Sequence, residues 1–185
     1  MQTKCYLDMD GVLANLFDFI SIKILDKEYK EIKTPEEKLK LKKIWTDKDL
    51  FIEKLGMPAD LFINLSPYST NDVLINKVIE KFNGFYICSS PAKMFPDECI
   101  LGKLRWIGQH IIPKYSTYFK GAVFPRQKSE YAMNEDRSKN ILIDDYQPYI
   151  DSWEAAGGIP IKLQSSLHDS QSILKLLEEE FKNIN

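Results

Sequence analysis

Apolar residues follow two spacings along this chain of 185 residues. In several segments they recur every three or four positions, as on one face of a helix, and short continuous runs between these segments are typical of buried strands. The predicted helices cover residues 15–25, 34–45, 48–55, 71–82, 98–111, 153–156 and 170–181. The predicted strands cover residues 4–7, 84–88, 118–124, 140–143 and 159–163. Because helix and strand alternate after residue 66, the pattern predicts an α/β fold with a parallel sheet and helices on both of its faces.

Two of the later helices have apolar stripes that predict which side faces the core. We expect the first to bury Ile100, Leu104, Ile107 and Ile111. We expect the terminal helix to turn Ile173, Leu174, Leu177 and Phe181 inward. An earlier helix begins with Thr34-Pro35-Glu36-Glu37, in which Thr34 caps the helix and Glu37 completes a capping box. The sequence Gly56-Met57-Pro58 is expected to end the short helix that follows.

Composition and charge narrow the class of protein. Hydrophobic residues make up 44% of the chain and charged residues 28%, as in ordinary globular proteins. The net charge of −2 argues against stable binding to nucleic acids or to acidic membranes. No apolar run is long enough to span a membrane, and Asp8 interrupts the only apolar run near the start, so no signal peptide is expected. Cys5, Cys88 and Cys99 lack metal-ligand spacing, and we expect reduced cysteines in a cytoplasmic protein.

Residues 23–48 differ in charge from the rest of the chain. Nine lysines against six acidic residues give this stretch +3, which leaves −5 for the remainder. The ordinary interpretation is a solvated helical face, and the alternative is a positive rim over an anion site.

Candidate chemistry begins where the first predicted strand ends. Asp8 and Asp10 are one residue apart, so both side chains can point to the same side, and Gly11 allows a tight turn. Two close carboxylates repel one another unless a cation or a shared proton relieves them. An isolated Asp-x-Asp-Gly is also compatible with a plain turn with acidic caps. Residues elsewhere in the chain are needed to distinguish a turn from a ligand site.

Polar residues also follow two later strands. Ser89 and Ser90 end one strand, Asp144 and Asp145 end another, and Lys128 lies between them. Parallel sheets bind ligands beyond the carboxyl ends of their strands, and four carboxylates there favour Mg²⁺. The lysine and the hydroxyl groups suggest an anionic ligand, most simply a phosphate. Singly, the serines could form a turn, the aspartate pair could cap a helix and the lysine could face solvent.

Together these pieces resemble the haloacid dehalogenase superfamily of phosphotransferases. The matching pieces are Asp8-Met9-Asp10-Gly11-Val12, Ile87-Cys88-Ser89-Ser90, Lys128 and Ile141-Leu142-Ile143-Asp144-Asp145. Within the superfamily the chain is most similar to the 5′(3′)-deoxyribonucleotidases. That similarity rests on Cys-Ser-Ser-Pro, Lys-Leu-Arg-Trp at 103–106, Arg126-Gln127-Lys128-Ser129, and Ile44-Trp45 with Phe51. The interval from Lys128 to Asp144 is longer than in those relatives.

The resemblance implies a role for each motif. Asp8 would be the nucleophile and Asp10 the general acid and base. Mg²⁺ would be held by Asp8, the backbone carbonyl of Asp10, and Asp144 or Asp145. The expected phosphate-binding residues are Ser89, Ser90 and Lys128.

The resemblance also implies a Rossmann-like core of residues 1–15 and 69–185, with a small, mainly helical cap of residues 16–68 inserted after the first strand. The expected substrate-binding residues are Leu16, Trp45, Phe51 and Arg126. Trp45 and Phe51 could stack on a base or simply pack the cap, and Leu16 stands where relatives often place an aromatic residue.

The leading hypothesis is a Mg²⁺-dependent phosphatase of (deoxy)nucleoside monophosphates. The same chemistry on a sugar phosphate or a polynucleotide end is an alternative, as is a catalytically silent regulatory domain that binds phosphate. A homodimer is compatible with the sequence, which leaves the oligomeric state open.

Overall fold

The computed structural model describes residues 3–184, and its centre is a five-stranded sheet in which all strands run parallel. The strands are β1 (Cys5–Leu7), β2 (Phe85–Cys88), β3 (Phe119–Val123), β4 (Ile141–Asp144) and β5 (Ile159–Lys162). Their order is β3-β2-β1-β4-β5, so β1 lies in the middle, with Tyr6 paired to Tyr86 on one side and to Leu142 on the other. The predicted fold class is confirmed.

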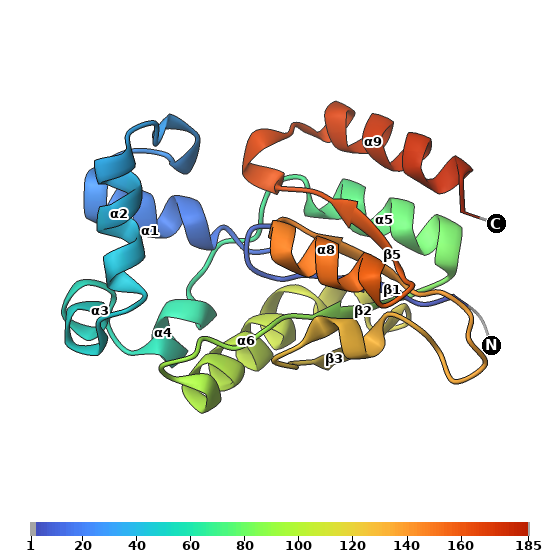
Figure 1. Ribbon diagram of the computed structural model, residues 1–185, viewed down its shortest axis with the longest axis horizontal. Helices are drawn as coiled ribbons and strands as arrows, with labels where there is room; N and C mark the ends of the chain where they lie inside the picture. The colour runs from blue at the N-terminus through green and yellow to red at the C-terminus, as the bar shows by residue number, and fades with distance from the viewer. Residues whose placement is uncertain (1–2, 185) are drawn as a thin grey trace.

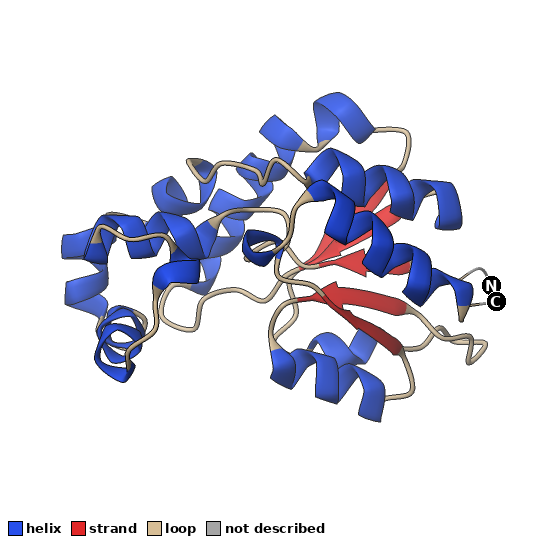
Figure 2. Ribbon diagram, turned by 90° about the horizontal axis from the view of Figure 1, so that it is seen from above, coloured by secondary structure: helices blue, strands red, loops and turns tan. Residues whose placement is uncertain are grey.

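Side chains that alternate along β1 build a separate core on each face of the sheet. Cys5 and Leu7 belong to the larger core, which contains the buried faces of α5 (Asn71–Phe82), α6 (Pro96–His110) and α9 (Ser170–Lys182). Tyr6 points to the opposite face, where Trp153 of α8 (Gln147–Ala155) lies with its ring centroid 5.7 Å away. Figure 2 shows helices on both sides of the strands. Short helical turns complete the core: α7 (Ile112–Tyr115), η2 (Lys128–Tyr131) and η3 (Ser165–Leu167).

A helical insertion separates β1 from α5 and lies at one end of the molecule (Figure 1). It consists of α1 (Leu16–Leu25), η1 (Tyr29–Glu31), α2 (Pro35–Ile44), α3 (Lys48–Leu55) and α4 (Pro58–Ile63). The chain enters and leaves it side by side, since Asn15 N donates to Ser66 O and Tyr68 N donates to Leu13 O, both at 3.0 Å. The predicted capping box of α2 is present. The exact domain limits at residues 15/16 and 68/69 stay a prediction.

Helix α4, which the sequence pattern missed, joins the insertion to the core. Gly56 and Pro58 do end α3, but Pro58 is also the first residue of the new helix, a position that proline favours. Helix α4 packs against α6 at Gly102, where an added Cβ would lie 2.6 Å from the carbonyl oxygen of Ala59 and 2.8 Å from Phe62 Cβ. The two backbones approach this closely only because residue 102 has no side chain.

Two of the predicted inward faces need correction. In α6 the buried residues are Cys99, Gly102, Lys103, Trp106 and Ile107. The predicted stripe included Leu104, which is 49% exposed, because α6 turns Lys103 toward the sheet edge instead. In α9, Leu174 is 38% exposed, while its three predicted companions are buried. No helix within residues 3–184 combines the length and the apolar character needed to cross a membrane.

Replacing Gly102 with Ala should destabilise the protein by overpacking the contact between α4 and α6. The expected cost is about 1–3 kcal/mol, which for a chain of this size lowers Tm by roughly 2–12 °C. Gly108→Ala in the same helix is the matched control, because nothing lies within 4 Å of its added Cβ. Removing a helical glycine there should raise Tm slightly. Equal Tm changes in the two variants, measured by calorimetry, would contradict the close helix contact.

Candidate active site

The loop after β1 turns sharply and places two carboxylates at the sheet edge. Met9 O accepts hydrogen bonds from Leu13 N and Ala14 N at 2.9 and 2.7 Å, which closes the loop on itself. Gly11 has φ +84°, a conformation that other residues rarely adopt, and its added Cβ would lie 2.7 Å from Asp145 Oδ2. The loop therefore brings Asp8 and Asp10 next to the carboxylate that follows β4.

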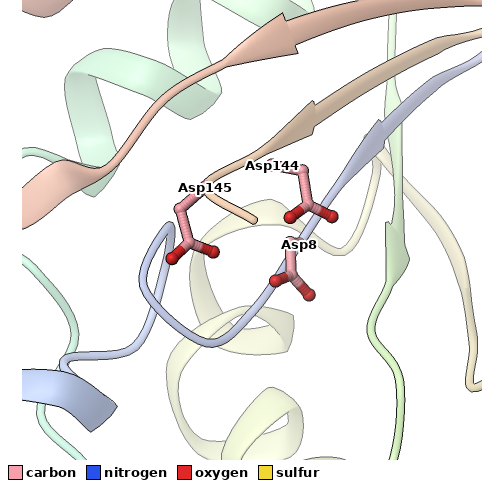
Figure 3. A group of neighbouring side chains, drawn as sticks. All are labelled: Asp8, Asp144 and Asp145. Atoms are coloured by element: carbon pink, nitrogen blue, oxygen red, sulfur yellow. The ribbon is translucent and has the colours of Figure 1, made fainter. Parts of the chain in front are cut away.

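Three carboxylates meet where β1 and β4 end. Oxygen atoms of Asp8, Asp144 and Asp145 lie within 4.8 Å of one another (Figure 3). Asp8 and Asp144 are buried, and Asp145 is half-buried. The parallel pairing of β1 with β4 produces this group, since Leu7 and Ile143 are partners in the sheet and the next residues of both strands are aspartates.

Lys128 joins two of these carboxylates. Its side chain is almost fully buried, and its Nζ lies 2.8 Å from Asp8 Oδ1 and 2.6 Å from Asp144 Oδ2. The ring of Tyr149 covers the ammonium group at 4.6 Å from the ring centroid. Lys128 is thus an internal cation at the sheet edge and not a solvent-facing residue.

Lys103 forms an ion pair with Asp10, as Lys128 does with Asp8 and Asp144. Sequence reasoning did not place Lys103 in the site. Its Nζ lies 2.7 Å from Asp10 Oδ2, 2.8 Å from Ser89 Oγ and 3.0 Å from the carbonyl oxygen of Ser90. The side chain is fully buried on α6, with its ammonium 5.1 Å from the ring centroid of Phe62. The one available signal was the motif Lys-Leu-Arg-Trp, which the chain shares with the family that it resembles.

Burial dominates the electrostatics of this group. It raises the pKa of Asp145 to about 8 and that of Asp144 to about 6, with the charge of Asp8 adding to both shifts. Burial also raises the pKa of Asp10, although Lys103 opposes that shift. Burial alone would lower the pKa of both lysines, but the carboxylates outweigh it and raise them, so both lysines stay charged.

The donor set fits a divalent cation. With all four carboxylates ionised, the group of four carboxylates and two lysines carries a formal charge of −2, and each lysine is already engaged. Within the described residues nothing donates a hydrogen bond to Asp145, so its oxygens are free to bind a metal. Carboxylate oxygens clustered this closely suit Mg²⁺. Asp8, Asp144 and Asp145 are the residues that would hold it.

A cavity of about 320 Å³ opens in front of the carboxylates, toward the helical insertion. The predicted site residues that line it are Asp8, Asp10, Leu16, Trp45, Ser89, Ser90, Lys128 and Asp145. Leu16 is aliphatic and buried, but its neighbour Phe17 and the ring of Phe62 add aromatic surface to the same wall. Sequence reasoning missed both rings.

Two predicted substrate contacts lie elsewhere. Phe51 is fully buried and packs against Trp45 and Phe95 at centroid distances of 5.4 and 5.5 Å, which is the packing position that the sequence also allowed. Arg126 is exposed and lines a neighbouring cavity of about 400 Å³, which shares residues 90–93 and Tyr149 with the first cavity.

Comparison with one solved structure supports the fold. No protein-family model and no curated protein matches the chain. A predicted phosphatase from Clostridium acetobutylicum matches 95% of this chain and 91% of its own, with 14% identity and a TM-score of 0.53. A hydrolase from Streptococcus pneumoniae TIGR4 matches over 97% and 100%, with 14% identity and a TM-score of 0.49. A HAD family enzyme from Bacteroides thetaiotaomicron, solved as a magnesium complex, matches over 94% and 98%, with 14% identity and a TM-score of 0.48.

Mg²⁺ should stabilise the protein, and more so at high pH. Unfolded aspartates ionise near pH ~3.9, so with folded pKa values of about 6 and about 8 for Asp144 and Asp145 the metal-free folded state binds extra protons. Its stability therefore falls as pH rises from about 4 to 8. A cation replaces those protons. At a Mg²⁺ concentration of 100 times the Kd, binding raises the free energy of unfolding by about 2.7 kcal/mol, which corresponds to a rise in Tm of about 5–11 °C.

The measurement is Tm with Mg²⁺ and with EDTA at pH 6 and pH 8. Asp145→Asn should lose most of the Mg²⁺-dependent gain, while Asp97→Asn, on the exposed first turn of α6, should keep it. A gain that is equal in both variants would rule out the carboxylate group as the metal site.

Proposed function

We propose that the protein is a Mg²⁺-dependent phosphomonoesterase that acts on (deoxy)nucleoside monophosphates through an aspartyl phosphate on Asp8. One observation carries this proposal: separate buried lysines hold the two carboxylates of the β1 loop. Lys128 and the metal-binding group surround Asp8, whereas Lys103 holds Asp10. Two carboxylates in such different surroundings suit two different chemical roles.

Asp8 is the proposed nucleophile. Its Oδ1 faces Lys128 at 2.8 Å, and no residue in the described range donates to its Oδ2. Oδ2 would attack phosphorus, forming the aspartyl phosphate as the bond from phosphorus to the leaving oxygen breaks. Bound Mg²⁺ would supply charge neutralisation between the phosphate and the carboxylates.

Asp10 is the proposed general acid and base. Lys103 fixes its Oδ2, while its Oδ1 is buried without a hydrogen-bond partner among residues 3–184. The raised pKa of Asp10 favours a carboxyl group that still holds a proton when the substrate arrives. That proton would pass to the leaving oxygen. Asp10 would then accept a proton from the water that attacks phosphorus and releases Asp8 and inorganic phosphate.

The serines after β2 and Lys128 are the proposed phosphate-binding residues. Ser90 Oγ is buried and has no partner in the described part of the chain, so its hydroxyl is free to donate to a phosphoryl oxygen. Ser89 Oγ accepts from Lys103, which leaves its own hydrogen available. Donors that are fixed before the substrate binds stabilise the charge of the transferring group.

The nucleotide preference rests on the aromatic wall of the cavity. Phe17, Trp45 and Phe62 from the insertion and Tyr146 and Tyr149 from the core line the same cavity as the carboxylates. A base can stack on such rings, and stacking on an aromatic side chain contributes about 1–3 kcal/mol in single-strand binding proteins. A sugar phosphate has no aromatic ring that could stack on this surface. Arg126 is proposed only as a peripheral contact.

Asp8→Asn should abolish turnover in a folded protein, because the attacking carboxylate is gone. The test is phosphate release from nucleotides, sugar phosphates and p-nitrophenyl phosphate, with Mg²⁺ and with chelator, on samples whose Tm confirms folding. Steady-state activity in a verified Asp8→Asn sample would refute the nucleophile assignment. Ca²⁺ should replace Mg²⁺ poorly because it favours looser coordination.

Asp10→Asn should remove acid–base assistance and leave the nucleophile. Such assistance contributes roughly 10²–10⁴-fold, so kcat should fall by about that factor on a nucleotide. The fall should be smaller on p-nitrophenyl phosphate, whose leaving group needs little protonation. If both substrates lose the same factor, Asp10 is not the acid.

Trp45→Ala should lower the selectivity for a nucleotide over p-nitrophenyl phosphate, measured as the ratio of their kcat/KM values. Loss of one stacking contact predicts a fall of roughly 5–150-fold. Phe51→Leu loosens the same aromatic packing from behind without reaching the cavity, so it should leave the ratio within about twofold of wild type. An equal drop in both variants would assign Trp45 to packing alone.

A further inference from the structure

A second cavity, which we call the cap cavity, lies at the helical insertion. It adjoins the cavity in front of the carboxylates, which we call the catalytic cavity. The volume of the cap cavity is about 450 Å³, within the usual range for ligand pockets. It is lined by Phe17, Ile20, Tyr29, Lys38, Leu41, Lys42, Trp45 and Tyr146. Three of these residues, Phe17, Trp45 and Tyr146, also line the catalytic cavity, so the two spaces adjoin.

The walls of this cap cavity are aromatic and held in place. The rings of Phe17 and Tyr29 stack with centroids 5.0 Å apart. Asp18 Oδ1 accepts a hydrogen bond from Tyr29 N at 3.0 Å, which fixes η1 against α1. On the core side, Tyr146 directly follows the metal-binding aspartates and is 55% exposed. A flat ring entering from the catalytic side would meet apolar surface from α1, from η1 and from Tyr146 at the start of α8.

The rim of the cap cavity is basic. Lys38 and Lys42 lie four residues apart on α2, so both point to the same side of that helix. Neither forms an ion pair with any residue from 3 to 184. Glu37, the nearest acid of α2, is occupied by Lys27 and by the backbone N–H groups of Lys33 and Thr34. Two uncompensated positive charges therefore border an apolar, ring-sized space.

We infer that the substrate carries a second anionic group besides its reacting phosphate and its base, as in a nucleoside 3′,5′-bisphosphate. The reacting phosphate would lie at Asp8, the ring would lie among Phe17, Tyr29 and Trp45, and Lys38 and Lys42 would bind the second anion. This inference rests on the proposed function, because it extends the same substrate. It gives a chemical role to the excess positive charge of residues 23–48.

The alternative position for a second anion is the cavity beside the Ser90 loop. Lys93 and Arg126 line that space, but Tyr149 is its single aromatic residue and the other walls are Ser90, Pro91, Ala92 and Pro96. The cap cavity is favoured because it combines paired lysines with rings that continue from the catalytic cavity.

The test compares thymidine 5′-monophosphate with thymidine 3′,5′-bisphosphate. Binding is measured by calorimetry with Mg²⁺ on Asp8→Asn, which should not turn over, and on wild type with EDTA. Wild-type kcat/KM is measured in parallel. We expect the bisphosphate to bind about 5–25-fold more tightly, with a preference that weakens as salt is raised. Lys38→Gln/Lys42→Gln should bring that preference to within about twofold of unity.

Lys40→Gln/Lys43→Gln is the matched control. It removes the same charge from the same helix at residues that do not line the cavity, and it should keep both the preference and the basal activity on p-nitrophenyl phosphate. If both double variants lose the preference for the bisphosphate equally, the preference comes from the overall positive charge of α2 and not from the cap cavity. Loss in Lys93→Gln/Arg126→Gln instead would move the anion to the Ser90 loop, and either result overturns the inference.

The two proposals fail in different ways. If wild type hydrolyses the monophosphate but binds the bisphosphate no more tightly, the cap-cavity inference is wrong and the phosphatase proposal stands. If no phosphate ester is hydrolysed, the phosphatase proposal is wrong, and the binding measurements still decide whether Lys38 and Lys42 hold a second anion.

Discussion

Two buried lysines hold three of the four carboxylates at one edge of the sheet, and the rest of the site depends on that balance. Moving a charge out of water is costly, so removing Lys103 or Lys128 would leave carboxylates buried and uncompensated. When all four carboxylates are ionised, two negative charges are left without a lysine to balance them. A divalent cation would balance both. Lys128 comes from a short turn after β3 and Lys103 from α6, so elements distant in sequence meet only because the parallel sheet gathers their ends at one edge.

Sequence alone was sufficient for the fold class and for the carboxylates, for a simple geometric reason. Parallel strands end at a common edge, and the residue after each strand is set by the register. Once residues 5–7 and 141–143 are recognised as strands, Asp8 and Asp144 must be neighbours, and Leu7 is indeed the partner of Ile143. Helix limits were predictable where capping chemistry is local, as at Thr34 and Glu37, whose reciprocal hydrogen bonds involve only four residues.

Features that depend on packing between distant segments could not be predicted in this way. The apolar stripe of α6 indicated Leu104 as buried, but its position is decided by carboxylates on another element, which draw Lys103 inward. A lysine is counted as polar in any periodicity, so its burial leaves no signal in the apolar pattern. Phe51 and Phe17 show the same limit. Both are aromatic and both belong to the insertion, yet one is enclosed by its neighbours and the other reaches the cavity.

Helix α6 connects the carboxylate site to the insertion, because two adjacent residues of this helix contact one each. Gly102 lets α4 approach, and Lys103 reaches Asp10 one position later. Phe62 takes part in both, because its Cβ lies beside Gly102 and its ring lies 5.1 Å from the ammonium of Lys103, and it also lines the cavity in front of the carboxylates. Trp106 adds a third tie through its Nε1, which donates to Leu65 O at 2.7 Å where the chain leaves the insertion. A displacement of α4 would therefore disturb the surroundings of Asp10, the proposed acid, together with the cavity wall, because both depend on the same helix contact.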